Sequence, residues 1–412
     1  MRLIYSILIR AYGLLVRIAA LFNGKARQWV QGRRNLLRNL EDALKHIDRS
    51  DNPIIWFHVS SLGEFEQGRP VIEAIREKWP EKKILLTFFS PSGYEVRKNY
   101  KEADYVCYLP PDTQTNARKF LKIVQPETVF FVKYDFWFNY MKRLHDLNIP
   151  LYFISALFRK EQHFFKWYGG WFRLHLGYVT RFFVQNPESV ELLKSAGIAS
   201  VTLTGDTRFD RVYSIAARSA PLPLIEKFCA GKKVFIAGSS WEPDEAVYLP
   251  LMKEPGLNMK FIIAPHDTSA ARIRFIREHI DQPVVCLSEL NEENAGQTDV
   301  LIIDSVGILA RLYRYATIAF IGGAFGSGLH NIQEPVTFGV PVFFGPGYHK
   351  FREARELVAL GGAFSITSSG ELTEKVLEIT GSHHEHERLS TICSDYVAVN
   401  RGATEKIMQY LK

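Results

Sequence analysis

Two stretches of the sequence combine polar side chains with glycine in a way that could support chemistry. The first follows an apolar run and reads His58-Val-Ser60-Ser61-Leu-Gly63-Glu64. A strand that ends in small residues and turns at Gly63 would place Glu64 at the start of a helix, where backbone N–H groups favour a carboxylate. Glu64 could then act as the general base on a hydroxyl group, with Ser60, Ser61 and Gly63 lining the substrate site. The same position suits a helix-capping carboxylate, and the spacing favours neither role.

The second stretch, residues 322–335, is a glycine-rich loop after another apolar run. Glycines let a backbone approach a phosphate, and a following helix would offer N–H donors. Glu334, one turn into that helix, could bind ribose hydroxyls. A purely structural turn is the alternative. The loop residues expected to bind substrate are Gly323, His330, Asn331, Ile332, Gln333 and Glu334.

Further candidates lie where other apolar runs end. Arg208 could bind a phosphate through two parallel hydrogen bonds, or it could pair with Asp210 and hold a domain junction together. His266 is as easily a satisfied loop residue as a ligand. The remaining candidates at such positions are Lys133, Asp135, Ser239, Pro265 and Gly307 with its neighbours Ile308 and Leu309.

An α/β fold would bring these residues together. From Pro53 onward, short apolar runs alternate with amphipathic stretches, and the pattern starts again near Val234. This alternation predicts two Rossmann-like, doubly wound domains whose parallel sheets are covered on both faces and whose carboxyl edges face a cleft. We expect an N-terminal anchor over 1–45, one domain over 46–215 and another over 216–412, joined near Ala216–Pro223, with a final helix that packs back on the first domain.

The runs themselves give the expected elements. Strands are expected at Ile54–Val59, Ile84–Phe88, Thr128–Val132, Leu151–Ile154, Phe182–Val184, Val234–Ala237, Lys260–Ala264, Val300–Ile303, Ile318–Ile321 and Val340–Phe343. Helices are expected at Glu64–Lys78, Thr113–Ile123, Phe136–Leu147, Glu188–Ser195, Glu242–Lys253, Ser269–His279, Gly307–Tyr313 and Phe351–Leu360.

Charge is distributed unevenly along the 412 residues. Residues 1–45 hold nine Lys or Arg against two acidic residues, which accounts for the whole formal net charge of +7. A surface-wide nucleic-acid footprint is therefore not expected. The four cysteines are scattered, as in reduced cytosolic proteins. The sequence has no Asp-x-Asp pair and no cluster of residues at metal-ligand spacing, so we expect neither a metal nor a cofactor.

The first 22 residues are apolar but are interrupted by Arg2, Arg10 and Arg17. On a helical wheel the three arginines fall within roughly 80° of one another. This pattern favours a helix that lies in a membrane interface, with arginines reaching anionic headgroups. A core helix packed on the folded body and a single tilted span are alternatives, and a secretory signal is disfavoured because no small-residue cleavage site follows.

In order along the chain, these motifs resemble the Kdo (3-deoxy-D-manno-octulosonic acid) transferases of Gram-negative bacteria, a metal-independent glycosyltransferase family with two Rossmann-like domains. The family's His-x-x-Ser-x-Gly-Glu motif, whose Glu is the proton acceptor, matches His58–Glu64. Its Gly-Gly…Gly-His-Asn-x-x-Glu-Pro loop matches Gly322–Pro335. Its Gly-Asn-x-Lys-Phe-Asp motif is similar to Gly205–Asp210, with Arg208 in place of a lysine that stabilises the departing charge.

Three segments depart from the family pattern. Glu-Thr-Glu-x-Trp-Pro-Asn becomes a segment with Lys133 and Asp135, which leaves open which residue stabilises the transition state. Ala-Pro-Arg-His becomes Ala264–Asp267, which removes a permanent charge from the nucleotide site. Gly-Glu-Leu becomes Gly307–Leu309. These changes indicate a divergent branch of the family.

The resemblance implies an inverting transferase at the cytoplasmic face of the inner membrane, attached through its N-terminal helix. CMP-Kdo would bind the second domain through Pro265, His266, Gly307–Leu309 and Asn331–Glu334, and a lipid A precursor would bind the first. Glu64 would be the base, and Arg208 together with Asp135 or Lys133 would order or neutralise the charged groups of the substrates. The rival hypotheses are a transferase that uses a UDP-sugar on a lipid-linked acceptor and a non-catalytic scaffold at the membrane surface.

Overall fold

The computed structural model describes residues 1–326 and 328–411. They form two compact units, each described here by itself: unit 1 comprises Met1–Arg211 together with the chain from Arg401 onward, and unit 2 comprises Val212–Asn400. The first boundary between the units falls inside helix α10 (Arg208–Arg218), a few residues before the join expected near Ala216–Pro223. The helix crosses this boundary because helix-forming residues continue until Arg218.

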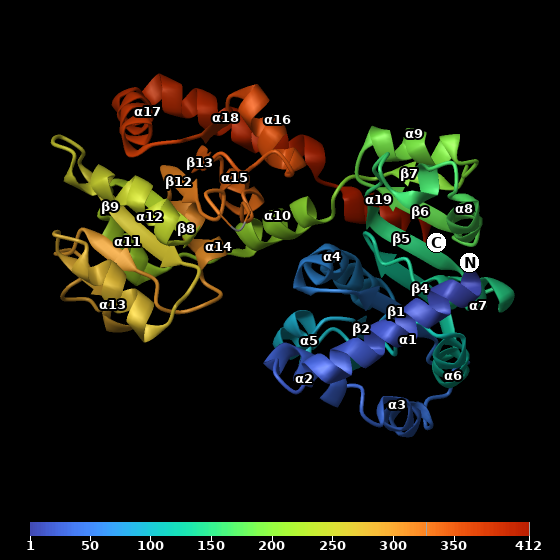
Figure 1. Ribbon diagram of the computed structural model, residues 1–412. Coiled ribbons are helices and arrows are strands. Elements are labelled where there is room, and N and C mark those ends of the chain that lie inside the picture. The colour runs from blue at the N-terminus through green and yellow to red at the C-terminus, as the bar shows by residue number, and fades with distance from the viewer. Residues whose placement is uncertain (327, 412) are drawn as a thin grey trace. The chain divides into compact units, whose positions relative to one another are not determined.

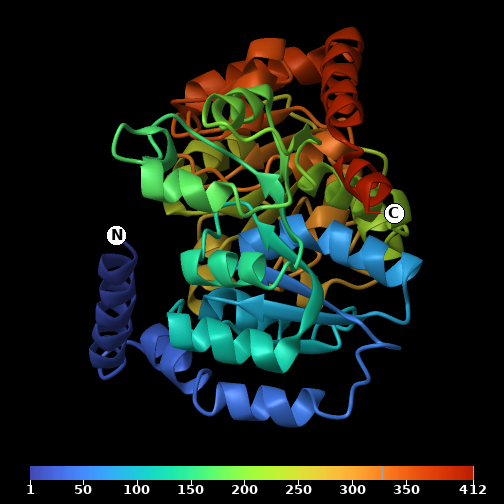
Figure 2. The same cartoon turned by 90° about the vertical axis from the view of Figure 1, so that its right-hand side faces the viewer.

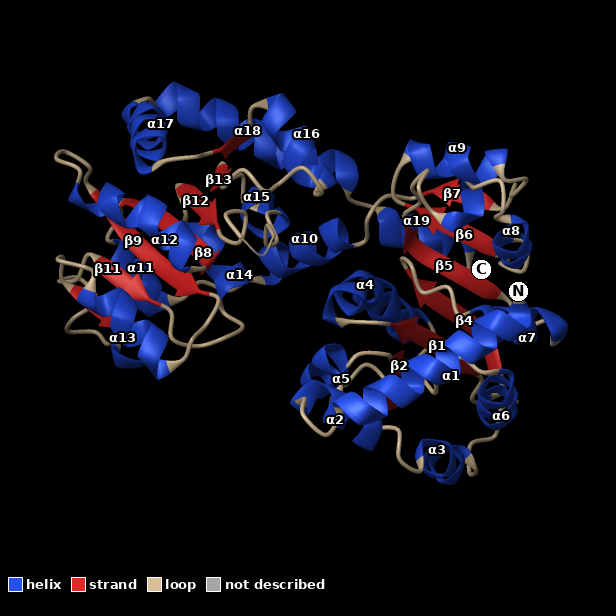
Figure 3. Ribbon diagram, in the orientation of Figure 1, coloured by secondary structure: helices blue, strands red, loops and turns tan. Residues whose placement is uncertain are grey.

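Unit 1 is built on a seven-stranded parallel sheet with the order β3-β2-β1-β4-β5-β6-β7. Helices lie on both faces of the sheet (Figure 3). The five expected strands are present, and β3 and β7, which the sequence pattern missed, close its two edges. The strands are β1 Ile54–Val59, β2 Lys83–Phe88, β3 Tyr105–Tyr108, β4 Pro126–Val132, β5 Leu151–Ala156, β6 Arg181–Val184 and β7 Val201–Leu203.

Every residue of β1 is buried because its alternate side chains enter two different cores. Ile54 and Trp56 belong to one apolar cluster, whereas Phe57 and Val59 belong to the other. Such a strand must be continuously apolar, as the sequence showed. The helices of this unit are α1 Arg2–Ala19, α2 Gly24–Gln31, α3 Leu36–Leu44, α4 Leu62–Lys78, α5 Pro91–Arg97, α6 Gln114–Val124, α7 Phe138–Asp146, α8 Gly170–Leu176, α9 Pro187–Ser195 and α19 Ala403–Tyr410, with the 3₁₀ turn η1 His163–Phe165.

Unit 2 repeats the plan with the strand order β10-β11-β9-β8-β12-β13-β14, again all parallel. The sequence pattern missed β10 and β14, which form the edges. The strands are β8 Lys233–Ser240, β9 Met259–Pro265, β10 Val284–Cys286, β11 Val300–Ile302, β12 Ile318–Ile321, β13 Val342–Phe344 and β14 Ala363–Ser365. The helices are α11 Pro223–Cys229, α12 Glu242–Tyr248, α13 Ala270–Glu278, α14 Leu309–Leu312, α15 Gln333–Thr337, α16 Arg352–Leu360, α17 Ser369–Gly381 and α18 His383–Asn400, with the 3₁₀ turns η2 Leu249–Lys253, η3 Leu287–Glu289 and η4 Tyr313–Tyr315.

Each sheet has one point at which its strand order reverses. In unit 1 this point lies between β1 and β4, and in unit 2 it lies between β8 and β12. The connections on its two sides run to opposite faces of the sheet and leave a crevice at the carboxyl ends of the strands, where ligands of doubly wound folds bind. The two sites predicted from the sequence, at His58–Glu64 and at Gly322–Pro335, both begin at the carboxyl ends of strands next to these points.

Helix α1 lies at the periphery of unit 1, and Figure 1 shows it running from beside α7 to beside α2. Its inner side is fastened by Tyr5, whose ring packs edge-on against Phe138 at 5.1 Å and whose hydroxyl donates to Asp112 at 2.7 Å. Two turns later, Tyr12 contacts Trp29 of α2. The helix therefore packs on the folded body by one narrow side, as in the core-helix alternative.

The outer side of α1 remains exposed, and Figure 2 shows it facing away from the other elements of unit 1. This side is entirely apolar, while Arg10 and Arg17 flank it on one edge. None of the helices within the described chain is both long and apolar enough to cross a bilayer. The exposed apolar residues of α1 and of the turn after it are Leu3, Ile4, Ile7, Leu8, Leu14, Leu15, Ile18, Leu21 and Phe22.

Tyr5→Phe should loosen the docking of α1. At pH 8, above the pKa of about 6 to which burial raises Asp112, the lost bond is one to a carboxylate, worth ~1.5–3 kcal/mol. Protection of the α1 amides from hydrogen exchange should fall by about ten-fold or more. Tyr12→Phe is the matched control, because no described residue bonds the Tyr12 hydroxyl. Equal protection in both variants would show that the bond from Tyr5 to Asp112 does not hold α1 in place.

Candidate functional site

Glu64 lies in the first turn of α4, immediately after β1. It is half-buried, and its carboxylate accepts a hydrogen bond from the Ser61 hydroxyl. Ser61 is the N-cap residue, yet its hydroxyl donates to Glu64 and does not accept from the helix N–H groups. Glu64 and Ser61 therefore do not form a reciprocal cap within the described chain, which leaves a carboxylate at the carboxyl edge of the sheet.

A second carboxyl group, that of Asp135, lies beside Glu64 at the end of β4. Asp135 is 7% exposed, and one of its oxygens accepts a hydrogen bond from Ser60. Burial raises the pKa of Asp135 well above its usual range, and the neighbouring Glu64 charge raises it further. Burial therefore disfavours the charged form of Asp135. Two adjacent carboxyl groups in unlike environments are the usual arrangement for separate roles in proton transfer.

His58, the first residue of the motif, is buried beside this pair of carboxyl groups. Its Nε2 accepts from the Trp137 indole at 2.8 Å, so Nδ1 carries the proton and donates to Thr87 at 2.9 Å. Burial lowers the pKa of His58 to about 3, and the ring is neutral. Its 3.8 Å contact with Asp135 is therefore no ion pair at neutral pH. The histidine fixes the loop that carries Asp135 and Trp137.

Lys133 and Arg208 bring positive charge to the same edge. The Lys133 ammonium lies 5.0 Å from the centre of the Tyr134 ring and lowers the pKa of Asp135. Burial raises the pKa of Tyr134, and the charges of Glu64 and Arg208 shift this pKa in opposite directions, so both charges lie close to the Tyr134 hydroxyl. Glu64, Lys133 and Arg208 thus lie around Tyr134 and Asp135, the fourth residue predicted to be catalytic, although the roles of all four stay predictions.

Arg208 has a different acidic partner from the one considered above. Its Nε and Nη2 donate to a single oxygen of Asp206 at 2.9 and 2.7 Å. Asp210 instead accepts from the backbone N–H groups of Gly402 and Thr404 at 2.5 and 2.6 Å and so binds the start of α19. The suggested Arg208–Asp210 pair was therefore wrong: Asp206 faces Arg208 because it precedes α10 and also bonds its backbone N–H.

In unit 2, Asp244 pins the glycine loop to the start of α12. One of its oxygens accepts from the N–H groups of Trp241 and Gly323 at 2.8 and 2.9 Å. Gly323 has φ +95°, and Gly322 is packed so tightly that a Cβ there would lie 2.4 Å from the Ser239 carbonyl oxygen. The loop is thus held against the end of β8, and Gly322 and Gly323 lie where side chains would not fit.

Three rings stack above this loop. Trp241 lies over His266 at 4.4 Å between centroids, and His266 lies over His330 at 4.7 Å. The Trp241 indole donates to His330 Nε2 at 3.1 Å, and burial lowers the pKa of His330. His330 is therefore neutral, and its proton is on Nδ1. Predicted ligands from β9 and from the glycine loop meet here, and Trp241 joins them.

The end of the glycine loop differs from expectation. Helix α15 has five residues, and Glu334 is in its first turn, not one turn in. Asn331 accepts from the Gln333 N–H and donates to Glu334, both at 3.1 Å. Gln333 is 1% exposed, and both polar atoms of its side chain lack a protein partner among the described residues. A buried amide of this kind is available to a ligand or water.

The other predicted donor residues lie at neighbouring strand ends. Ser239, at φ +54°, is near the end of β8, and Pro265 is the last residue of β9. Exposed Gly307, at φ +95°, begins the turn after β11 in which Ile308 caps α14. Leu309 packs beside Gly238 of β8. All of them therefore belong to the carboxyl edge of β11, β9, β8 and β12, which are consecutive in this sheet.

Sequence reasoning did not find several residues that shape both sites. Gln67 donates to Asp206 at 3.2 Å, and Thr207 joins α10 to Ser155 at 2.7 Å. Asp244 was inconspicuous, although the acidic run after Trp241 is a signal for a helix start. In the described part of the chain, no three His, Cys, Asp or Glu side chains converge as metal ligands would.

Comparison with known proteins agrees with this geometry. Residues 33–211 match the family model described as 3-deoxy-D-manno-octulosonic-acid transferase (kdotransferase). The chain is 25% identical to 3-deoxy-D-manno-octulosonic acid transferase of Haemophilus influenzae, covering 87% of this chain and 86% of that one. It is 28% identical to the Aquifex aeolicus enzyme of the same name, with 79% and 85% covered. Over most of its length the chain is therefore similar to the Kdo transferases.

The fold of this chain is also found in solved structures. UDP-GlcNAc 2-epimerase from Neisseria meningitidis, bound to UDP-GlcNAc, matches with a TM-score of 0.60 at 18% identity, over 87% of this chain and 99% of that one. Acinetobacter baumannii MurG matches with a TM-score of 0.54 at 11% identity, over 87% and 98%. The expected pair of Rossmann-like α/β domains of the glycosyltransferase type is thereby confirmed.

Gly322→Ala should destabilise unit 2. The added Cβ would also lie 2.6 Å from the Ser240 Cα, and such overpacking costs ~1–3 kcal/mol. Calorimetry should show a melting temperature of unit 2 lower by several degrees. Gly326→Ala, in the same loop, is the control because its Cβ would have no atom of the described chain within 4 Å. Equal melting of the two variants would count against the tight contact.

Proposed function

We propose that this protein transfers Kdo from CMP-Kdo to a hydroxyl of a lipid A precursor, with unit 1 binding the acceptor and unit 2 the donor. The observation that carries the proposal is the pair of carboxyl groups at the β1–β4 switch point. Glu64 lies beside a carboxyl group whose pKa is raised by burial, and Arg208 and Lys133 lie on the same edge. The similarity of the chain to Kdo transferases supports Kdo as the sugar.

Glu64 removes the proton from the acceptor hydroxyl. The hydroxyl oxygen attacks the anomeric carbon of Kdo with inversion, while the bond from that carbon to the phosphate oxygen breaks and CMP leaves with the electron pair. Because burial raises the pKa of Asp135, this group places less negative charge beside the anionic substrates. Arg208 and Lys133 supply positive charge for the developing anion.

The CMP group binds unit 2 at the switch point between β8 and β12. Neutral His330 can donate from Nδ1 to a phosphate oxygen, and the buried Gln333 amide can both donate and accept. Neither group carries a permanent charge. This is consistent with the absence of an arginine from the segment Ala264–Asp267.

Glu64→Gln should reduce transfer by about 10²–10⁴-fold, because the amide cannot accept the proton. Nucleotide release and product mass are followed with CMP-Kdo and a tetraacylated lipid A precursor, and CMP-Kdo binding should be unchanged. Glu77→Gln, on the exposed side of the same helix, is the control. Substantial turnover by the Glu64 variant would exclude Glu64 as the base. Turnover with UDP-sugars in place of CMP-Kdo would exclude CMP-Kdo as the donor.

We also infer that α1 attaches the protein to the cytoplasmic face of the inner membrane. The exposed apolar side of α1 would enter the interface, and the flanking arginines would meet lipid headgroups. The surplus positive charge of residues 1–45 favours an anionic surface.

Replacing both Leu15 and Ile18 with Glu should lower the affinity for lipid vesicles by about 100-fold or more, since each apolar side chain contributes ~1.5–3 kcal/mol on burial. Vesicle co-sedimentation measures the effect. The matched control makes the same change at exposed Leu360 and Val399 of unit 2. Equal binding by both double variants would refute attachment through α1.

A further inference from the structure

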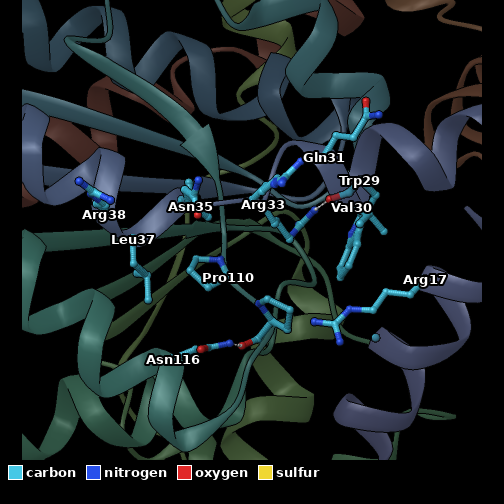
Figure 4. A pocket seen from close by; sticks show the side chains of 14 residues that line it. Arg17, Trp29, Val30, Gln31, Arg33, Asn35, Leu37, Arg38, Pro110 and Asn116 are labelled. Carbon is cyan, nitrogen blue, oxygen red and sulfur yellow. Dashed lines mark hydrogen bonds between the residues drawn. The ribbon is translucent and has the colours of Figure 1, made fainter.

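A pocket of about 700 Å³ lies between the N-terminal helices and the β3 end of unit 1 (Figure 4). Helix α1 forms one wall, α2 and the start of α3 form another, and the segment after β3 closes the third. The lining residues are Gly13, Arg17, Trp29, Val30, Gln31, Arg33, Arg34, Asn35, Leu36, Leu37, Arg38, Pro110, Pro111 and Asn116.

The pocket is strongly cationic, because four of its lining residues are arginines and none is acidic. Arg33 forms its base. The Arg33 guanidinium donates to the carbonyl oxygens of Leu109 at 2.9 Å and Phe89 at 2.8 Å and lies 3.9 Å from the centre of the Trp29 ring. Burial lowers the pKa of Arg33 to about 9, and no carboxylate contributes to its electrostatic surroundings. A buried charge without a counter-charge is costly unless an anion binds beside it.

The other three arginines lie at the rim of the pocket. The structure gives Arg17, Arg34 and Arg38 no hydrogen bond or ion pair with the residues it describes. In Figure 4, Arg17 reaches from α1 across the pocket toward Pro110 and Asn116. Guanidinium groups placed in this way bind phosphate oxygens through two parallel hydrogen bonds.

Gly13 of α1 lines the pocket without filling it. Its backbone geometry is that of an ordinary helix. A Cβ at this position would have no atom of the described chain within 4 Å. A small side chain here would therefore leave the pocket open, whereas a large one would enter it.

The surroundings indicate an amphiphilic occupant. Leu14 and Ile18, next to the pocket residues of α1, are 57% and 52% exposed on the apolar side of that helix. A phosphate held by the arginines would leave its acyl chains free to run along this side. Such a molecule is a membrane lipid.

The occupant is separate from the reacting acceptor hydroxyl. Phe89 and Trp137, whose rings lie 4.8 Å apart, stand between Arg33 and the carboxyl pair: Arg33 bonds the backbone of Phe89, and Trp137 bonds His58. The pocket is next to β3, whereas Glu64 follows β1, two strands away in the sheet.

We propose that this N-terminal pocket binds the phosphate headgroup of an anionic membrane phospholipid that is not the substrate. The inference rests on the membrane attachment proposed above and adds a defined lipid site to it. Binding of this lipid would fix α1 at the membrane in one orientation, which diffuse attraction between a basic segment and a surface does not do.

Gly13→Phe tests the pocket without changing charge, because the ring would fill it, whereas Gly13→Ala would leave it open. Binding of soluble dihexanoyl-phosphatidylglycerol to the full chain is measured by calorimetry, with the phosphatidylcholine analogue as reference. The wild type and Gly13→Ala should bind the anionic lipid. Gly13→Phe should bind it at least about ten-fold more weakly. Equal binding by Gly13→Phe, or equal binding of the two lipids, would overturn the proposal.

A charge-matched pair of triple variants separates the pocket from general attraction. The variant R17Q/R34Q/R38Q removes the three positive charges at the rim of the pocket. The variant R2Q/R10Q/K25Q removes the same number of charges from exposed positions outside the pocket. Both should lose salt-sensitive binding to phosphatidylglycerol vesicles. Only the first should lose binding of the soluble lipid, and equal loss in both would refute a defined site.

Transfer assays in nonionic detergent without phospholipid separate this proposal from the proposed function. There, Gly13→Phe should leave the KM for the lipid A precursor unchanged. A raised KM would assign the pocket to the acceptor and overturn the phospholipid proposal. If the wild type transfers no Kdo at all, the proposed function fails, while the lipid-binding measurements still decide the pocket.

Discussion

The burial of both faces of two parallel sheets constrains everything else in this protein. Neighbouring parallel strands cannot be joined by a tight turn, so helices must cross each face, and the strands become continuously apolar. Polar side chains can then gather only where strands end. In unit 1 that edge holds Glu64, Asp135 and Arg208, and in unit 2 it holds the glycine loop with its three stacked rings. The chemistry is confined to the edges because the sheets leave no other place for it.

Buried and partly buried aspartates fasten segments that are distant in sequence. Asp112 accepts the first N–H groups of α7, and Asp210 accepts those at the start of α19. Asp244 ties the glycine loop to α12, and Asp206 orients Arg208. In each case the carboxyl group satisfies donors that would otherwise be unpaired at a helix end or loop. One oxygen of Asp135 and one of Asp244 have no hydrogen-bond partner within the described chain, and the one on Asp135, at the edge that holds Glu64, is available to substrate.

The features set by local sequence could be predicted, and those set by distant contacts could not. The strand at Ile54–Val59 follows from a short apolar run, and a helix carrying Glu64 near its start was also predicted, although α4 begins at Leu62 and includes Gly63. The edge strands β10 and β14 have three residues each, too few to show a pattern.

The same limit applies to single side chains. Arg208 has an acidic residue two positions away on either side, and only the helix start at Arg208 decides that Asp206 is its partner. The importance of Asp244 depends on Gly323, which lies 79 residues further along the chain. For α1, the positions of the arginines predicted an amphipathic helix, but they could not show that Tyr5 ties it to the body.

The bond between Tyr5 and Asp112 spans 107 residues, which matters while the chain is being made. Helix α1 leaves the ribosome first, and at roughly 5–20 residues per second the partner carboxylate follows several seconds later. During that interval both sides of α1 are uncovered, so the helix can reach a lipid surface before unit 1 exists. With the membrane attachment that we propose for α1, the rest of the unit would fold onto a helix already at the lipid surface.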